Sequence, residues 1–161
     1  MNFDHKIFAL TSLKDIKIDR TKKIVLAGGC FDVIHYGHIM LLQKARSAGD
    51  ILILLLESNE FIGAEKKKEP IHTQQQRAEI LAAFGYVDYV IQLPLLKDPD
   101  NDYKEIVKKI HPAIIAYTSP DPKESQKKKL AQEVNAKTLA IPYLSSFSSS
   151  QLTPYAPIFR N

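Results

Sequence analysis

Short apolar runs alternate along this chain with segments whose apolar residues recur at helical spacing, and this alternation constrains the fold most. Five runs are expected to be strands: 23–29, 50–58, 86–93, 113–117 and 137–144. Four segments are expected to be helices: 36–48, 73–84, 100–110 and 123–134. A continuously apolar run suits a strand buried on both faces. Because strands that alternate with helices need crossover connections, the sequence predicts an α/β fold: an open, mostly parallel five-stranded sheet with helices on both faces.

The chain has 161 residues, which suits one domain with a sizeable core. We expect an N-terminal extension over 1–22, which could hold a helical turn, and the domain proper over 23–161. Lys and Arg number 22 against 18 Asp and Glu, and part of the excess lies in the runs "EKKKEP" and "KESQKKK". This mild basicity is compatible with phosphate-bearing substrates and does not favour nucleic acid.

Nothing in the sequence indicates export or a membrane span. The N-terminal residues carry charges of both signs where a signal peptide has an unbroken apolar core, and the single cysteine cannot form an intramolecular disulfide. The longest apolar run, "ILILLL", is far shorter than the roughly 20 residues of a membrane helix. We therefore expect a cytoplasmic protein without a membrane or nucleic-acid partner.

The stretch "GGCFDVIHYGH" over 28–38 lies where the first predicted strand ends and a helix begins. In an open parallel sheet, ligands bind beyond the carboxyl ends of the strands. Gly28 and Gly29 leave backbone N–H groups open to a phosphate, and the helix start directs its partial positive charge there. His35 and His38 are three residues apart and face the same side of the helix, and Gly37 leaves room between them. The pattern predicts a phosphate-binding site.

Imidazole suits this chemistry because it donates hydrogen bonds to phosphate oxygens and, when protonated, stabilises developing negative charge. A purely structural alternative is that His35 caps the helix and His38 is an ordinary polar residue. A zinc site at Cys30, His35 and His38 is a further alternative, but a second Cys or His pair at finger-like spacing is missing. The chain has neither GxxxxGK[ST] nor GxGxxG, which sets aside a P-loop and a dinucleotide fold.

The segment "GCFDVIHYGHIMLLQKARSAGD" resembles the signature GxFDxxHxGHxxLLxxAxxxGD of the cytidylyltransferase-like nucleotidyltransferases. Three later segments are similar to that family's lysine loop and arginine helix, its next strand and its I-S-T-T-x-I element: "SNEFIGAEKKKEPIHTQQQR", "GYVDYVI" and "FSSSQL". The resemblance covers about 23–152. It implies a Rossmann-like fold, transfer of a nucleotidyl group from ATP or CTP with Mg²⁺ to a phosphorylated sugar or alcohol, release of pyrophosphate, and a homodimer.

The resemblance also implies roles for individual residues. His35 and His38 would bind the triphosphate and stabilise the transition state, and Lys66 would neutralise a phosphate across the cleft. Which of Lys66 to Lys68 faces the site stays open. The structural alternative is that the lysines form a solvated loop. Acceptor-side contacts would come from Asp32, near the acceptor or metal, and Lys68; no residue is assigned as a metal ligand. The expected nucleotide-binding residues are Gly28, Gly29, Cys30, Phe31, Gly37, Arg77 (as a bidentate phosphate clamp), Ser148, Ser149 and Ser150.

Two segments depart from the family pattern. The chain has "AYTSPDP" at 116–122 where many relatives have a K-G-x-D-Y-like segment, and Pro154 and Pro157 interrupt the helix that usually follows the serines. We favour a stand-alone adenylyltransferase of heptose 1-phosphate, because the chain resembles these enzymes in "GGCFD" and in the extension ending in "RTKK". The alternative is a glycerol-3-phosphate cytidylyltransferase, because "EKKKEPIH" resembles the loop of those enzymes. A nucleotide-binding or regulatory protein with little turnover is the alternative of another class.

Overall fold

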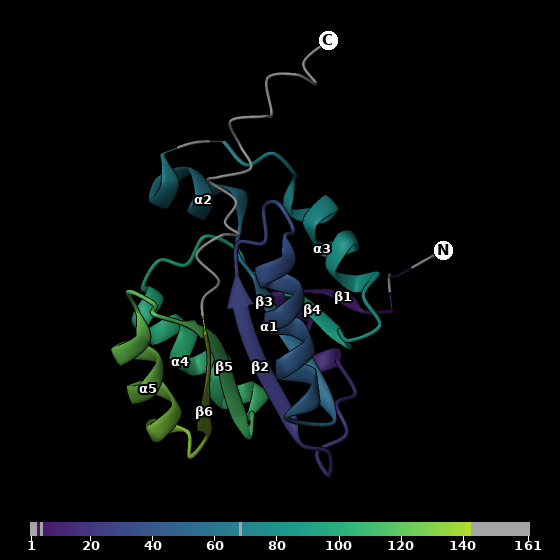
Figure 1. Ribbon diagram of the computed structural model, residues 1–161, viewed down its shortest axis with the longest axis vertical. Coiled ribbons are helices and arrows are strands. Elements are labelled where there is room, and N and C mark those ends of the chain that lie inside the picture. Colours follow the sequence, from purple (N-terminus) through teal and green to yellow (C-terminus); the bar gives the residue numbers. More distant parts are fainter. Residues whose placement is uncertain (1–2, 4, 68, 143–161) are drawn as a thin grey trace.

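The computed structural model describes residues 3, 5–67 and 69–142, without the side chain of Lys66. Its sheet has six strands in the order β1-β4-β3-β2-β5-β6 (Figure 1). Every pair of neighbouring strands is parallel. The strands are β1 Ile7–Ala9, β2 Ile24–Gly29, β3 Ile51–Leu56, β4 Tyr89–Gln92, β5 Ile114–Ser119 and β6 Lys137–Pro142. The predicted α/β class and parallel sheet are confirmed, with six strands where the sequence predicted five.

The helices pack on both faces of this sheet, as expected. They are η1 Leu10–Asp15 (a 3-10 helix), α1 Tyr36–Ser47, α2 Asn59–Lys66, α3 Gln74–Ala82, α4 Pro99–Ile110 and α5 Glu124–Glu133. One core lies between the sheet and helices α1 and α3, and the other lies between the sheet and helices α4 and α5. Within β3, Leu52, Leu54 and Leu56 belong to the first core, and Ile53 and Leu55 belong to the second. Side chains on both faces of this strand are therefore buried.

The N-terminal segment, predicted as an extension outside the domain proper, is part of the sheet. Strand β1 pairs in parallel with β4, with Ile7 opposite Val90. The Lys6 Nζ atom donates hydrogen bonds to the carbonyl oxygens of Ala82, at 3.2 Å, and Val87, at 2.8 Å. Sequence periodicity missed this strand because it has three residues and lies at the sheet edge, where pairing with β4 determines its conformation.

The connections place loops and helix starts beyond the carboxyl edge of the sheet. From β2 the chain passes to β3 on one side, and β5 later joins β2 on the other side, so the strand order reverses next to β2. Such a reversal point is where open parallel sheets bind ligands. Helix α2, which follows β3, was expected as a loop; it begins because the Ser58 side chain accepts a hydrogen bond from the Phe61 N–H at 3.1 Å. None of the helices among the described residues has the length and apolar character needed to span a membrane.

Candidate phosphate-binding site

The two predicted histidines meet at the carboxyl end of β2. His35 is the N-cap residue of α1, and His38 lies in the first turn, where its backbone N–H donates to the His35 carbonyl at 2.9 Å. Their rings stack with centroids 3.8 Å apart and an interplanar angle of 27°. The His35 imidazole makes no capping hydrogen bond to the first turn of α1, all of which the structure describes. The helix-cap alternative is therefore not supported. Both rings lie together at the N-terminus of α1, which carries the partial positive charge of the helix.

The loop from β2 to α1 is built around a buried aromatic ring. Phe31 is buried and has a φ of 47°, a left-handed conformation that side-chain-bearing residues seldom adopt. Its ring lies 5.1 Å from the His38 ring, centroid to centroid. A Cβ atom added at Gly29 would lie 3.3 Å from Phe31 Cε2, so this glycine lets the ring approach the strand. Phe31 therefore packs against the His38 ring from the protein interior. Gly28 is exposed, so its backbone at the end of the strand is accessible to a ligand.

Asp32 links this loop to the segment before α3. The residue is 2% exposed, and its Oδ1 accepts hydrogen bonds from the backbone N–H groups of Ile71, at 2.8 Å, and His72, at 3.2 Å. The Oδ2 atom is buried and lacks a hydrogen-bond partner among the described residues. A divalent cation that arrives with a nucleotide usually needs only one or two protein carboxylates. Asp32 is thus the carboxylate of this loop that fits such a cation, although the described residues contain no group of three or more His, Cys, Asp or Glu that could hold a metal by themselves.

Arg77 lies inside the protein and contacts protein oxygens rather than the open surface. It is fully buried, at 0% exposure, and four of its five N–H groups donate to protein oxygens. The acceptors are the carbonyls of Cys30 at 2.6 Å, Glu57 at 2.9 Å and His72 at 3.2 Å, and Asn59 Oδ1 at 2.7 Å. Burial lowers the pKa of this guanidinium, and the charges of Asp32, Cys30 and Glu57 oppose that shift.

These contacts differ from the predicted bidentate phosphate clamp. The guanidinium joins the segments that follow β2 and β3 to the segment that precedes α3, so the contacts give Arg77 a positioning role. The sequence could not reveal this, because an arginine in a helix with the periodicity of α3 is equally compatible with the surface. Helix α3 itself begins as predicted, with Thr73 in a capping box with Gln76.

Two groups that the sequence analysis missed lie at the end of β3. Glu57 is 7% exposed, and its Oε1 accepts a hydrogen bond from the Tyr103 hydroxyl of α4. Burial raises the pKa of Glu57, while the Tyr103 hydrogen bond and the charges of Lys123 and Arg77 act in the opposite direction. The pKa of Tyr103 is raised, first by burial and then by the Glu57 charge. The only sequence signal was an acidic residue directly after the apolar run "ILILLL".

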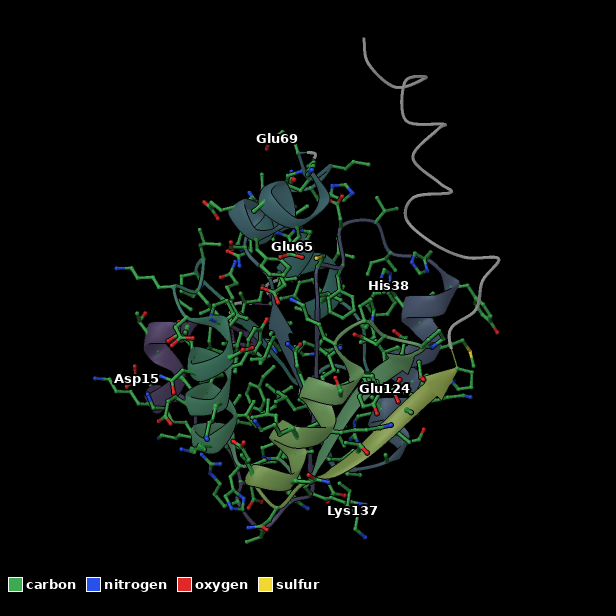
Figure 2. The ribbon with its side chains drawn as sticks, turned by 90° about the vertical axis from the view of Figure 1, so that its left-hand side faces the viewer. Asp15, His38, Glu65, Glu69, Glu124 and Lys137 are labelled. Carbon is green, nitrogen blue, oxygen red and sulfur yellow. The ribbon has the colours of Figure 1, made fainter. Side chains whose placement is uncertain are left out.

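The remaining predicted residues are only partly placed by the structure. Cys30 lies half-buried in the β2–α1 loop, and Gly37 lies in the first turn of α1. Lys66 is the last residue of α2, but its side chain, like Lys68 and Ser148 to Ser150, lies outside the described residues. Figure 2 shows His38 and Glu65 of α2 toward the carboxyl edge of the sheet and Lys137 at the opposite end.

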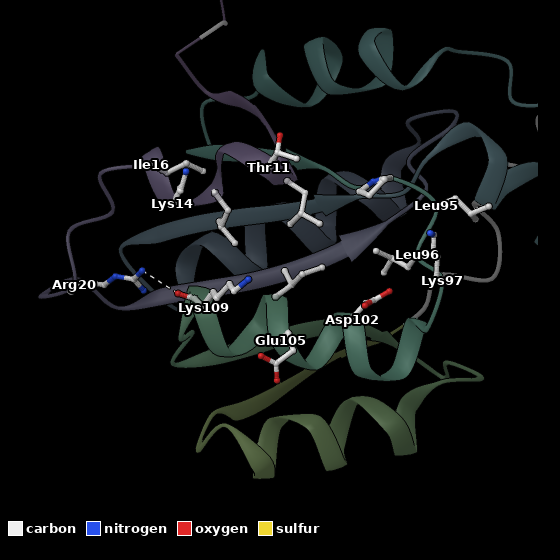
Figure 3. A pocket seen from close by; sticks show the side chains of 14 residues that line it. Thr11, Lys14, Ile16, Arg20, Leu95, Leu96, Lys97, Asp102, Glu105 and Lys109 are labelled. Carbon is white, nitrogen blue, oxygen red and sulfur yellow. Dashed lines mark hydrogen bonds between the residues drawn. The ribbon is translucent and has the colours of Figure 1, made fainter.

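A groove of about 960 Å³ lies apart from the histidines. It runs between η1, the β4–α4 connection and α4, and its lining includes the apolar Ile16 and Leu96 and the charged Lys14 and Asp102 (Figure 3). None of the predicted site residues that the structure describes lines it. The predicted phosphate-binding residues of the β2–α1 loop therefore lie outside this groove.

The chain matches a known family model and is similar to several known proteins. The family model described as Cytidylyltransferase-like matches residues 26–153. The chain is 38% identical to a FAD synthase of Thermococcus onnurineus over 132 residues, covering 80% of this chain and 85% of that protein. It is 40% identical over 115 residues to the bifunctional protein HldE of Campylobacter curvus, covering 70% of this chain and 24% of that protein. The crystal structure of a lipopolysaccharide core biosynthesis protein of Thermoplasma volcanium is similar in fold, with a TM-score of 0.61, 21% identity and coverage of 76% of this chain and 97% of that one.

Proposed function

The chain belongs to the cytidylyltransferase-like family and is a nucleotidyltransferase, and we propose that it transfers AMP from ATP to a phosphorylated small molecule and releases pyrophosphate. The observation that carries the proposal is the stacked pair of His35 and His38, 3.8 Å apart at the start of α1. Two imidazoles at a helix N-terminus, beside a glycine-bearing strand end, provide several hydrogen-bond donors for one triphosphate.

The relatives support ATP as the nucleotide. FAD, the product that gives FAD synthase its name, consists of AMP joined to FMN, and the phosphates of the two halves form the pyrophosphate linkage. This relative aligns with most of the chain. A CTP-dependent reaction, which the loop "EKKKEPIH" suggested, has no comparable support among these relatives. ATP is therefore the first nucleotide to test.

In the proposed reaction, an oxygen of the acceptor phosphate attacks the α-phosphorus of ATP in line. The new O–Pα bond forms as the bond between Pα and the bridging oxygen breaks, and pyrophosphate leaves with that oxygen and its electron pair. His35 and His38 donate hydrogen bonds to the phosphate oxygens on which charge increases, and the N-terminus of α1 adds its dipole. Since the acceptor phosphate is already ionised, no general base is needed, and catalysis rests on positioning and charge stabilisation.

The protein supports the histidines through Phe31 and Arg77. The Phe31 ring fixes one side of His38, and Arg77 holds the Cys30 carbonyl within the same loop. Mg²⁺ bound with the triphosphate would neutralise part of its charge, and Asp32 is the residue that would hold it. Such a site needs little rearrangement between substrate binding and reaction, which favours transition-state stabilisation.

Two acceptors follow from the sequence and from the relatives. A heptose 1-phosphate-like sugar phosphate is favoured by the resemblance of "GGCFD" and by the match to HldE, and FMN is favoured by the match to FAD synthase. Both are phosphate monoesters of a polyhydroxylated carbon skeleton. We propose that the acceptor belongs to this class. The homodimer and the cytoplasmic location stay predictions.

The test is a screen of all four NTPs against FMN, heptose 1-phosphate and glycerol 3-phosphate, with Mg²⁺. Pyrophosphate release is measured together with the mass of the nucleotidylated product. We expect ATP with FMN or heptose 1-phosphate to give both signals. ATP binding without product from any acceptor would instead support the nucleotide-binding protein of low turnover.

A further inference from the structure

The carboxyl end of β3 holds a buried carboxylate next to the phosphate-binding loop. The backbone N–H of Glu57 donates to the Gly29 carbonyl at 3.2 Å, and its own carbonyl accepts from Arg77. These two contacts fix Glu57 against the end of β2. Its side chain is held in turn by the Tyr103 hydroxyl from α4. The position of the carboxylate is therefore determined by three different parts of the fold.

This carboxylate does not favour the folded state by itself. Withdrawing an ionised carboxylate from water is unfavourable unless its oxygens are paired. An ionised carboxylate offers about four acceptor positions, and in the described part of the chain Tyr103 is the only side chain that donates to it. An apolar residue would continue the core of β3 at lower cost. A buried acceptor with remaining capacity, at a sheet edge where ligands bind, indicates a ligand that carries hydrogen-bond donors.

A cation and an aromatic ring lie beside the same strand ends. Lys123 Nζ lies 5.4 Å from the centroid of the Phe61 ring, within the range of a cation–π contact. Lys123 is the N-cap residue of α5, directly after the segment 116–122, and Phe61 belongs to α2. Since α5 follows β5 and α2 follows β3, Lys123 reaches across the end of β2, which lies between those strands. The Lys123 charge also lowers the pKa of Glu57. We therefore treat Glu57, Tyr103, Lys123 and Phe61 as one group.

We propose that Glu57, oriented by Tyr103, recognises the polyhydroxylated body of the acceptor together with Lys123 and Phe61. The carboxylate accepts hydrogen bonds from acceptor hydroxyl or N–H groups, the Phe61 ring packs on the carbon skeleton, and Lys123 donates to its oxygens. This inference rests on the proposed function and names the part of the site that selects its acceptor. Glu57 acts on binding and not on the reacting phosphorus, so it is a specificity-determining residue.

The position of Glu57 in the fold favours contact with the acceptor rather than with the nucleotide. The histidines that receive the triphosphate lie on the β2–α1 loop, and the predicted serine contacts follow β6. Glu57 follows β3, on the other side of β2 from β5 and β6, and the chain continues from it into α2, which ends at Lys66. The family resemblance places the acceptor phosphate near that lysine, and the proposal places the body of the acceptor between it and Glu57.

The test measures acceptor binding separately from turnover. Calorimetry with a non-hydrolysable ATP analogue present gives the Kd of FMN and of heptose 1-phosphate for the wild type, Glu57→Gln and Tyr103→Phe. Glu105→Gln and Tyr89→Phe are the matched controls, because Glu105 is exposed on α4 and the Tyr89 hydroxyl has no described hydrogen bond. We expect Glu57→Gln to raise the Kd of the true acceptor about 10- to 100-fold, the usual effect of losing a hydrogen bond to a charged group.

We expect Tyr103→Phe to raise the same Kd by about 3- to 10-fold, since it removes only the group that orients Glu57. The Kd of the ATP analogue and the values for both control variants should stay within about twofold of the wild type. Which of the two acceptors shows the effect identifies the source of the polyol phosphate.

An unchanged acceptor Kd in folded Glu57→Gln would overturn the inference, as would equal losses of acceptor and ATP-analogue affinity. Wild-type protein that binds the acceptor in a Glu57-dependent way but forms no product would contradict the proposed reaction and leave acceptor recognition supported. Wild-type protein that binds neither acceptor would contradict both.

Discussion

Substitution of Arg77 distinguishes an internal structural role from a phosphate clamp. In Arg77→Lys the charge remains, but one ammonium nitrogen replaces a planar guanidinium whose N–H groups donate to four oxygens in three segments. The lysine can retain one or two of these bonds. At least two oxygens then lose a donor, and each buried acceptor without a partner costs about 1–3 kcal/mol.

We therefore expect Arg77→Lys to lower the free energy of unfolding by about 3–5 kcal/mol, in the range found when a buried charged network is broken. For a chain of this size, this corresponds to a decrease in Tm of roughly 6–20 °C. The assay is equilibrium unfolding in urea, monitored by circular dichroism, with calorimetric Tm values. Arg46→Lys is the control, since Arg46 is half-exposed in its ion pair with Asp88 and should lose no more than about 1 kcal/mol.

The opposite pattern would refute this account of Arg77. If Arg77→Lys unfolds within about 0.5 kcal/mol of the wild type while its KM for ATP rises tenfold or more, the guanidinium faces the substrate. The phosphate clamp predicted from the sequence would then be correct, and the positioning role would be wrong. A large stability loss in Arg77→Lys, with ATP affinity maintained at low temperature, is the result that the contacts predict.

Three further predictions concern the loop, the buried acid and the N-terminal strand. Gly29→Ala should lower the free energy of unfolding by about 1–3 kcal/mol, because its Cβ would lie 3.3 Å from Phe31 Cε2 and the buried ring would have to move. Urea unfolding at the wild-type free energy would contradict this. Burial raises the folded-state pKa of Glu57 above its ordinary value of 4.5, so folding favours the protonated form. The resulting stability is present below pH 4.5 and is lost as the pH rises through the folded-state pKa. Glu57→Gln should therefore be more stable than the wild type at neutral pH in urea unfolding, with the difference vanishing in acid; a constant difference from pH 4 to pH 8 would exclude this cause. Lys6→Met should lower the free energy of unfolding by about 1–3 kcal/mol, because the hydrogen bonds to Ala82 and Val87 are lost. An unchanged free energy of unfolding in urea would show that β1 contributes little to the stability of the domain.

The parts of the fold that the sequence predicted are those determined by local pattern. The run "ILILLL" is buried on both faces, as a continuously apolar strand must be, and the 3.6-residue period brings His35 and His38 together. Helix α2 was missed because the lysine run after it indicated a loop, although Ser58 followed by Glu60 is a start signal for a helix.

The missed parts of the site depend on contacts between distant segments. Tyr103 and Glu57 are 46 residues apart, and Arg77 and Cys30 are 47 apart. No periodicity within either segment indicates such a contact, because the topology of the sheet creates it. The same applies to Lys123, which follows a segment that lacks the family's lysine and reaches the site only through the packing of α5 beside β5.

The central claim is that the stacked histidines stabilise the transfer of AMP. The most direct measurement is single-turnover formation of adenylylated acceptor by His38→Asn, with ATP binding measured by calorimetry. His111→Asn is the control, since His111 is the exposed C-cap residue of α4. We predict a rate at least about 100-fold lower for His38→Asn, the usual loss when one preorganised donor is removed, with the fold intact and the control at the wild-type rate. Product formation by His38→Asn at the wild-type rate would contradict the claim.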